Sequence, residues 1–327
     1  MNKLLISISL FFNALVSFGQ SFHSAPGTIG TNAIFKDSSC FVAWANNAVV
    51  QRGFLTIADT TFTSNNSNKV DFGTPQFATG PAEGDGTSVV SLGDGGIATL
   101  SFPLVIRDEA GPDFAVFENS FSDNYMELAH VEVSSDGIHF FRFPSISEQP
   151  TAIQLTNFTY SDCRMVNNLA GKYRAGYGTP FDLSEISDNP LLNKQAITHV
   201  KLIDVVGSID LNYGTTDANG TLINDAFPTP FASGGFDLDA VGIIHGTLGF
   251  SENLIDVQFF PNPVLDNLNL ILDGPASIEV KDMQHKTIAT FQHLNSTLIN
   301  CSDWNSGCYQ IVITKDNQLI YRKIVKL

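Results

Sequence analysis

The chain has 327 residues, of which 43% are hydrophobic and 11% aromatic, and this composition excludes an intrinsically disordered protein. The formal net charge of −16 excludes the basic surface that a nucleic-acid-binding protein needs. The length predicts two domains, or one large all-β domain followed by a small one.

The acidic charge is concentrated in the first part of the chain. Residues 21–255 contain 26 acidic and 10 basic residues, whereas residues 256–327 contain 7 and 6. The excess therefore belongs to the first predicted domain, where it either favours cations as partners or serves as a solubilising surface.

Residues 1–20 have the composition of a secretory signal peptide. Lys3 supplies a positive charge, a short apolar stretch follows, and small residues lie near Gly19. We expect cleavage near Gly19 or Gln20. Because no later apolar run approaches 18 residues, we expect no transmembrane segment in the mature chain.

Export permits disulfide bonds, and the chain has four cysteines. Two fall in each predicted domain, so Cys40–Cys163 and Cys301–Cys308 is the economical pairing among the three possible ones. Free thiols are the alternative. The spacing of cysteines and histidines does not match a zinc site.

Strand patterns dominate residues 21–250. Residues 97–102 and 129–133 alternate between apolar and polar side chains, and an Asp-Gly turn at 136–137 predicts a hairpin with residues 138–143. Residues 114–117, 197–206 and 236–245 predict further strands, and Asp182 could cap one short helical turn over 181–186. The sequence therefore predicts an all-β fold whose first domain is a β-sandwich or jelly roll, with long loops over 59–96 and 207–235.

The sequence pattern changes after residue 250. Residues 251–256 are predicted to form a linker, and residues 257–327 a small Ig-like β-sandwich. Three motifs follow in order: Phe259-Phe260-Pro261-Asn262-Pro263, then Gly307-Cys308-Tyr309-Gln310-Ile311-Val312-Ile313, then Lys323-Ile324-Val325-Lys326. This segment resembles the C-terminal sorting domain of type IX secretion substrates, which occur in Bacteroidetes.

That resemblance implies a route and a location. Such a chain would cross the inner membrane by the Sec pathway and the outer membrane through the type IX secretion machinery. The tail would then be removed, leaving the protein extracellular and released, or attached to lipopolysaccharide at the outer-membrane surface.

Residues 85–246 resemble a family of extracellular bacterial proteins usually described only as cell surface proteins, some of which carry PEP-CTERM anchors. The resemblance implies location and β-architecture but no molecular function. It rests on five segments in order, which are residues 89–96, 111–119, 127–137, 169–172 and 235–241.

The acidic residues at strand ends are the candidate metal ligands. Residues 114–117 are apolar on both faces, which predicts a central strand that ends at Glu118 and Asn119. A buried carboxylate is costly unless it is paired or bound to a metal. Carboxylate and amide oxygens are the ligands that Ca²⁺ prefers, so a site is predicted at Glu118, Asn119, Glu127, Asp204, Asp237 and Asp239.

Two further interpretations of these acids stay open. They could be held by backbone donors and by Arg107, Arg164 or Arg174, or two of them could act as catalysts. In the metal interpretation, the oxygens of Asp237 and Asp239 converge on one cation, because alternate residues of a strand share a face.

A second candidate metal loop is Asp217, Asn219 and Asp225. Its start resembles part of a calcium loop, but it lacks the spacing and terminal Glu of an EF-hand, so a plain Asn-Gly turn is the alternative.

The sequence therefore favours a secreted binding or adhesion protein with structural Ca²⁺ and an unknown extracellular ligand, which could be a glycan. The alternatives are a glycosidase-like hydrolase that uses two carboxylates, and a structural component of the surface layer. The sequence does not decide whether the protein is an enzyme. Trp44, Tyr173 and Tyr177 could form a platform for a sugar, although core packing is the simpler expectation for them.

Overall fold

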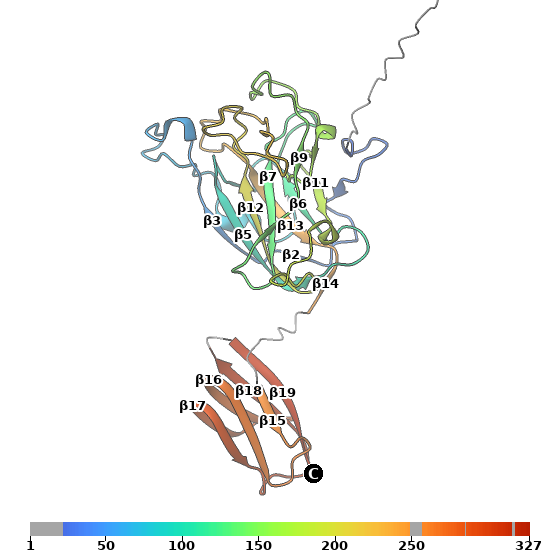
Figure 1. Ribbon diagram of the computed structural model, residues 1–327, viewed down its shortest axis with the longest axis vertical. Helices are drawn as coiled ribbons and strands as arrows, with labels where there is room; N and C mark the ends of the chain where they lie inside the picture. The colour runs from blue at the N-terminus through green and yellow to red at the C-terminus, as the bar shows by residue number, and fades with distance from the viewer. Residues whose placement is uncertain (1–21, 249–256, 285, 316–317) are drawn as a thin grey trace, which may run out of the picture. The chain divides into compact units, whose positions relative to one another are not determined.

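The computed structural model describes residues 22–248, 257–284, 286–315 and 318–327 (Figure 1). The chain divides into two compact units, Met1–Gly249 and Phe250–Leu327, which are described separately. The predicted signal peptide and the predicted linker lie outside the described residues.

The first unit contains two antiparallel sheets. In one sheet the strand order is β1-β11-β6-β13-β2, and β4 also pairs with β13. Its strands are β1 (Ile34–Phe35), β2 (Ala43–Trp44), β4 (Val90–Ser91), β6 (Phe114–Glu118), β11 (Tyr177–Phe181) and β13 (Asp237–Ile243).

In the other sheet the order is β14-β5-β12-β7-β8, and β3 also pairs with β5. Its strands are β3 (Asn47–Gln51), β5 (Ile97–Ile106), β7 (Ala129–Ser134), β8 (Phe141–Arg142), β12 (Ile197–Asp204) and β14 (Gly246–Thr247). The pairing of β7 with β8 confirms the predicted hairpin.

The remaining elements of this unit are short. They are β9 (Ile146–Ser147) paired with β10 (Val166–Asn167), and the 3₁₀ turns η1 (Ile57–Asp59), η2 (Pro75–Ala78), η3 (Cys163–Met165) and η4 (Leu183–Glu185). Asp182 caps η4 by accepting a hydrogen bond from the Ser184 amide, as the sequence predicts.

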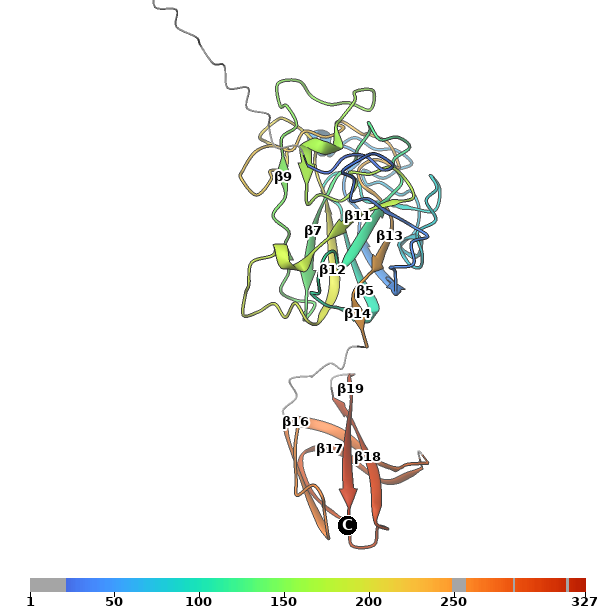
Figure 2. The ribbon, with the colours of Figure 1, turned by 90° about the vertical axis from the view of Figure 1, so that its right-hand side faces the viewer.

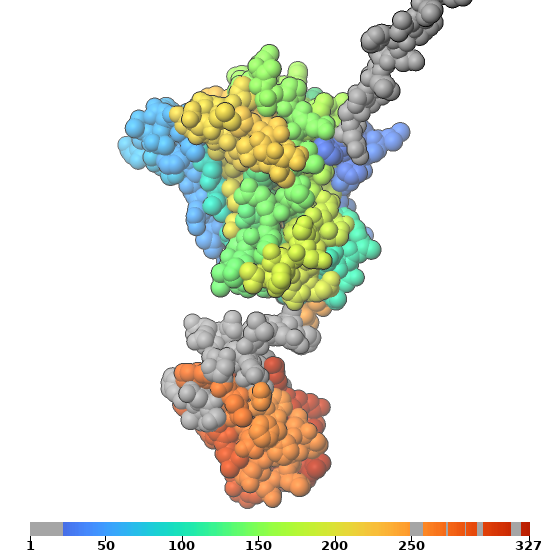
Figure 3. Space-filling model, viewed as in Figure 1, coloured from blue at the N-terminus to red at the C-terminus, as the bar shows by residue number. Residues whose placement is uncertain are grey.

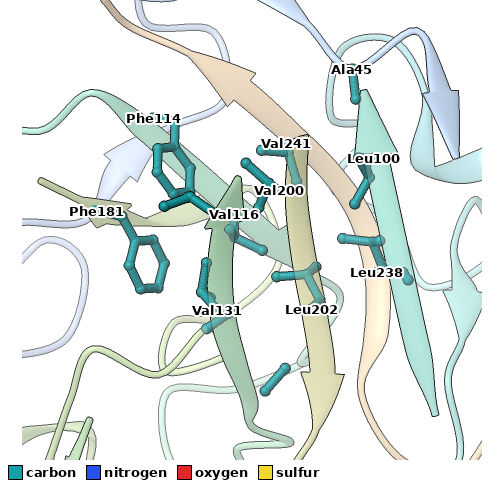
Figure 4. Close-up of a cluster of buried hydrophobic side chains, with 14 of the residues drawn as sticks. Ala45, Leu100, Phe114, Val116, Val131, Phe181, Val200, Leu202, Leu238 and Val241 are labelled. Carbon is teal, nitrogen blue, oxygen red and sulfur yellow. The ribbon is translucent and has the colours of Figure 1, made fainter. Parts of the chain in front are cut away.

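One hydrophobic core lies between the two sheets (Figure 4). Phe114, Val116 and Val241 contribute to it from one sheet, and Val131 and Leu202 from the other. Figures 1 and 2 show the strands of this unit stacked in layers, with long loops at its ends. The all-β sandwich predicted from the sequence is therefore confirmed.

Strand β6 is the central strand that its composition predicts. It lies between β11 and β13, and all of its side chains are buried. Phe114 and Val116 face the inter-sheet core, whereas Ala115 and Phe117 belong to a separate cluster with Ala240 on the other face of the sheet. The alternation along this strand therefore explains its burial on both sides.

The second unit contains a single described sheet, in the order β15-β16-β18-β19, with β17 also paired to β16. Its strands are β15 (Val257–Phe260), β16 (Asn267–Asp282), β17 (Thr287–Asn300), β18 (Gly307–Lys315) and β19 (Gln318–Lys326). Three register shifts between β16 and β17 allow the long strands to bend around their own apolar core.

Asn262 joins the first and last motifs of this unit. Its side-chain oxygen accepts a hydrogen bond from the Val325 amide at 2.9 Å, and its side-chain amide donates to the Lys323 carbonyl at 3.2 Å. The Val264 amide also bonds to the Val325 carbonyl. The Pro-Asn-Pro turn is thus fastened to the C-terminal strand.

The predicted disulfide pairing is wrong. All four cysteines are free: Cys40 is exposed, Cys163 and Cys301 are buried, and Cys308 is half-buried. Cys163 packs in a small core beside η3, and Cys301 in the core of the second unit, so each serves as an apolar side chain.

The core packing expected of Trp44 and Tyr173 is confirmed, and they form no sugar platform. Tyr173 is buried in the core beside η3, and Trp44 packs between Phe41 and Phe117. None of the helical turns in the described ranges has the length and apolar composition that crossing a bilayer requires.

Replacing Phe114 with Ala tests the assignment of the inter-sheet core. Its ring is buried and lies 5.4 Å from the Phe181 ring, so we expect a loss of about 3–5 kcal/mol in the free energy of unfolding. The matched control is Phe231→Ala, where 55% of the residue is exposed and little loss is expected. Equal losses in urea titrations of the two variants would contradict the assignment.

Candidate functional site

Antiparallel pairing brings four acid-bearing strand ends to the same end of the first unit. Strand β6 ends at Glu118 next to the start of β13 at Asp237, and β12 ends at Asp204 next to the start of β7. Glu127 precedes β7 by two residues. The loop between β12 and β13 covers this end, drawn in gold in Figure 1, and it brings in Asp225.

These acids form what is called here the acidic cluster. Each of these acids is at most 8% exposed. Each also interacts electrostatically with at least one other member, and the interaction raises the pKa of one of the two carboxyls. Its members are Glu118, Glu127, Asp204, Asp225 and Asp237.

Two members are fully occupied by backbone donors. Asp204 accepts hydrogen bonds from the amides of Gly95 at 3.0 Å and Phe236 at 2.7 Å, so it links the end of β12 to the start of β13. Asp225 accepts from the amides of Leu128 and Ala226, both at 2.6 Å. These contacts anchor the two long loops to the strands.

Two other members keep an oxygen without a partner. Glu118 Oε2 accepts from the Ser120 amide at 2.7 Å, but Glu118 Oε1 is buried and has no hydrogen bond. Asp237 Oδ1 is likewise buried and has no hydrogen bond of good geometry, although the Ser91 hydroxyl and the Asn119 side chain lie close enough to lower the pKa of this carboxyl. Unsatisfied buried carboxylate oxygens are costly unless the group is protonated or paired with a positive group.

The electrostatics of the cluster agree with its geometry. Burial first, and then the neighbouring carboxylates, raise the pKa values of Glu118 and Glu127 well above their usual range. Burial also raises the pKa of Asp204, that of Asp225 to about 7 and that of Asp237 to about 6. Near neutral pH the cluster therefore either keeps protons or needs a cation.

Arg52 is the arginine whose charge acts on Asp237, and it lowers the pKa of that carboxyl. Its guanidinium donates hydrogen bonds to the carbonyls of Phe72 at 2.7 Å, Gly73 at 2.6 Å and Ser91, so its donors are largely taken by backbone. Arg52 alone does not neutralise five acids.

The arginines considered from the sequence lie elsewhere. Arg107 pairs with Glu109, Arg164 with Asp162, and Arg174 with Asp123. The prediction that one of them holds the buried acids is therefore wrong.

Two glycines allow the backbone to approach the cluster closely. A Cβ at Gly235, where φ is +71°, would lie 2.7 Å from Asp204 Oδ1. A Cβ at Gly171, where φ is +85°, would lie 1.9 Å from the carbonyl oxygen of Glu127. Both positions therefore require glycine.

Asp239 does not join Asp237, which corrects the predicted convergence. The register of β13 against β6 shifts between Leu238 and Ala240, so Asp239 lies at a bulge. Its oxygens accept hydrogen bonds from the amides of Glu83 and Gly84 at 3.0 and 2.9 Å. Asn119 does lie beside Asp237, since its side chain hydrogen-bonds that carboxylate.

The second predicted loop is a turn held by backbone donors. Asp217 accepts hydrogen bonds from the amides of Asn219, Thr221 and Ser147, and Gly220 has a φ of +80°. Asn219 is exposed. Asp225, which was grouped with them from the sequence, instead belongs to the acidic cluster.

The structure adds residues that the sequence analysis did not single out. Tyr125 hydrogen-bonds Glu127, and burial together with the neighbouring acids raises the pKa of its phenol. Its position two residues before Glu127 is the only sequence signal for it, because alternate residues of an extended segment share a side.

A tight trio of acids exists away from the cluster. Among the described residues, Asp108, Asp113 and Asp182 are the three whose carboxylates each place an oxygen within 4.8 Å of the others. Asp113 is already satisfied by the amides of Glu109 and Leu183 and by His245. Among the described residues, no three carboxylates of the acidic cluster come this close together, so an ion could bind there only if these side chains moved toward one another.

Comparison with known proteins identifies the C-terminal unit. Residues 258–327 match the family described as secretion system C-terminal sorting domain. The chain thus carries a type IX sorting domain and is a secreted or cell-surface protein that interacts with the type IX secretion machinery. The resemblance of residues 85–246 to cell surface proteins stays a prediction.

The other comparisons add little. No curated protein matches the chain. Among solved structures, it is similar to a "Biofilm associated protein - BSP domain", with 10% sequence identity and a TM-score of 0.20. The match covers 71% of this chain and 48% of the other, so the chain spans about half the length of that structure.

The raised pKa values predict how stability depends on pH when divalent cations are removed. Folded Asp237 and Asp225 keep protons up to pH values of about 6 and 7, whereas in the unfolded chain they ionise near pH 4. The free energy of unfolding of the first unit should therefore fall as pH rises from about 4 to about 7.

Two histidines oppose this trend, since burial lowers the pKa of His130 to about 4 and also lowers the pKa of the half-buried His199. Both shifts add stability as pH rises, but the five acids outnumber the two histidines. Thermal melts in EDTA across this range test the expectation. A melting temperature that climbs steadily from pH 4 to pH 7 would contradict it.

Proposed function

We propose that residues 22–248 form a calcium-stabilised binding or adhesion module, which the sorting domain brings to the outside of the cell. The observation that supports it is the acidic cluster, in which Glu118 and Asp237 each keep a buried oxygen without a partner. Residues of this kind at loop-bearing strand ends suit a hard cation that neutralises their charge.

The donor set fits Ca²⁺ chemically. This ion takes six to eight oxygen ligands at about 2.3–2.6 Å, from carboxylates, amide oxygens and backbone carbonyls. Glu118, Glu127 and Asp237 would bind it directly, and the side chain of Asn119 lies beside them. Asp204 and Asp225, which accept hydrogen bonds from backbone amides, would hold the surrounding loops in place.

The hydrolase alternative receives less support. A glycosidase needs two carboxyl groups that flank the bond to be cleaved. Glu118 is 1% exposed and Asp204 3% exposed, so a polysaccharide cannot reach them. These acids are placed to hold structure together rather than to meet a substrate.

The final location completes the proposal. The module would cross the outer membrane through the type IX machinery and then be released or attached to surface lipopolysaccharide. The sorting domain supports the route, and the acidic surface of the first unit is compatible with an environment rich in divalent cations.

Glu118→Gln tests the calcium site. Gln has the same shape and can still accept from the Ser120 amide, but it removes one buried charge. In EDTA at pH 7 we expect the variant to melt higher than the wild type. Added Ca²⁺ should raise the melting temperature of the wild type by several degrees and that of the variant much less.

The matched control is Asp239→Asn. It removes an acid from the same region that lies outside the cluster. The variant should lose stability, because the amide nitrogen that replaces one oxygen cannot accept from the backbone, yet keep the full response to Ca²⁺. A wild-type melting temperature that does not change between EDTA and Ca²⁺ would refute the calcium proposal.

Deletion of residues 257–327 tests the export route. In a host with an active type IX system, we expect the shortened chain to stay in the periplasm and the full chain to reach the medium or the surface. Asn262→Ala, which breaks the contacts to Lys323 and Val325, should reduce export, whereas Asn267→Ala at an exposed site should not. Undiminished export of the deletion variant would refute the route.

A further inference from the structure

An open groove lies at the loop-bearing end of the first unit, close to the start of the described chain. It consists of two adjoining hollows of about 610 and 570 Å³, which share Ser24, Ile29 and Arg164. Figures 1 and 2 show the blue segment at the start of the described chain beside η3, and the Phe22 amide bonds to the Arg164 carbonyl at 2.9 Å.

The lining of the groove is polar but electrically balanced. Arg164 donates to both carboxylate oxygens of Asp162 at 2.6–3.1 Å, and Arg174 donates to both of Asp123 at 2.6 Å. Each acid of the lining is therefore matched by an arginine. Because the charges of the lining cancel, the groove disfavours a strongly charged ligand and favours an uncharged polar ligand.

Stacking and hydrogen-bonding groups occur together in the same wall. Tyr160 lines the groove and is 84% exposed, so its ring is accessible, while Gln149 is 6% exposed and held by a hydrogen bond that its side-chain amide donates to the Asp162 carbonyl at 3.2 Å. Sugar rings present a face of C–H groups and an edge of hydroxyls. A planar aromatic ring beside fixed amide, carboxylate and guanidinium groups matches both.

The wall of the groove is anchored to the acidic cluster. Residues 119–126 connect Glu118 to Glu127, and Asp123 and Asn124 of this segment line the groove. The Asn124 carbonyl accepts from the Ser161 amide at 2.9 Å, which joins this segment to the wall that carries Tyr160. The groove is therefore held in shape before a ligand arrives, which lowers the entropic cost of binding.

We propose that this groove is a binding site for neutral oligosaccharides, with Tyr160 as the stacking platform, Asp162 and Arg164 as hydrogen-bonding groups, and the buried Gln149 as a positioning residue that holds the Asp162 backbone. The proposal rests on the binding function proposed above and names the class of ligand. The volume of each hollow lies within the range of small-ligand sites, about 300–1,000 Å³.

The test is a glycan array probed with the full-length protein in the presence of Ca²⁺, followed by calorimetric titration with the neutral oligosaccharide that gives the strongest signal. Tyr160→Ala should weaken binding at least about tenfold, since it removes the aromatic ring on which the sugar would stack; the scale is taken from the loss of aromatic stacking on nucleobases. Gln149→Ala should weaken it too, with melting curves recorded to confirm that the variant is folded.

The matched control is Phe158→Ala, two residues away on the same loop. Phe158 is 95% exposed and does not line the hollows described above, so binding should be unchanged. Binding to sialylated or sulfated glycans alone, binding that survives Tyr160→Ala, or no glycan binding would overturn the proposal. If Ca²⁺ still raises the melting temperature in that case, the calcium-stabilised module stands and only the ligand assignment fails.

Discussion

The burial of five carboxylates at one end of a β-sandwich is the constraint on which the loop-bearing end of the first unit depends. Each acid lies where an antiparallel strand begins or ends, or in a loop that crosses those ends. Backbone amides satisfy Asp204 and Asp225, and in doing so they fasten the loops around residues 95, 128 and 236 to the strands. The loops in Figure 3 therefore cover this end as an ordered layer.

The architecture could be predicted from the sequence because hydrophobic alternation is a local signal. The pattern around Phe114 and Phe117 places one ring on each face of β6, and the structure confirms a separate cluster on each side. The meeting of Glu118 and Asp237 also follows from strand ends, since β6 and β13 are neighbouring antiparallel strands that begin and end together. The sorting domain was recognisable because its motifs lie at fixed places in a short chain segment.

The errors come from interactions that sequence spacing does not record. A β-bulge at Asp239 turns that side chain away from Asp237. The sequence does not reveal the bulge, because its alternation of polar and apolar residues continues through this segment. The partner of a buried acid depends on how a distant loop folds back, so Arg52 could not be chosen over the other arginines from its position. Counting cysteines per domain gives no distance between them, and all four are free.

The segment from Glu118 to Glu127 has a consequence for how the two proposed sites influence each other. Its ends lie in the acidic cluster and its middle forms one wall of the groove. An ion in the cluster and a sugar in the groove would therefore order the same stretch of backbone. Thermodynamic reciprocity then applies: if an ion in the cluster strengthens sugar binding by some factor, the sugar strengthens ion binding by the same factor. The eight residues of shared backbone, 119–126, would be enough to make binding to a surface depend on the mineral content of the surroundings.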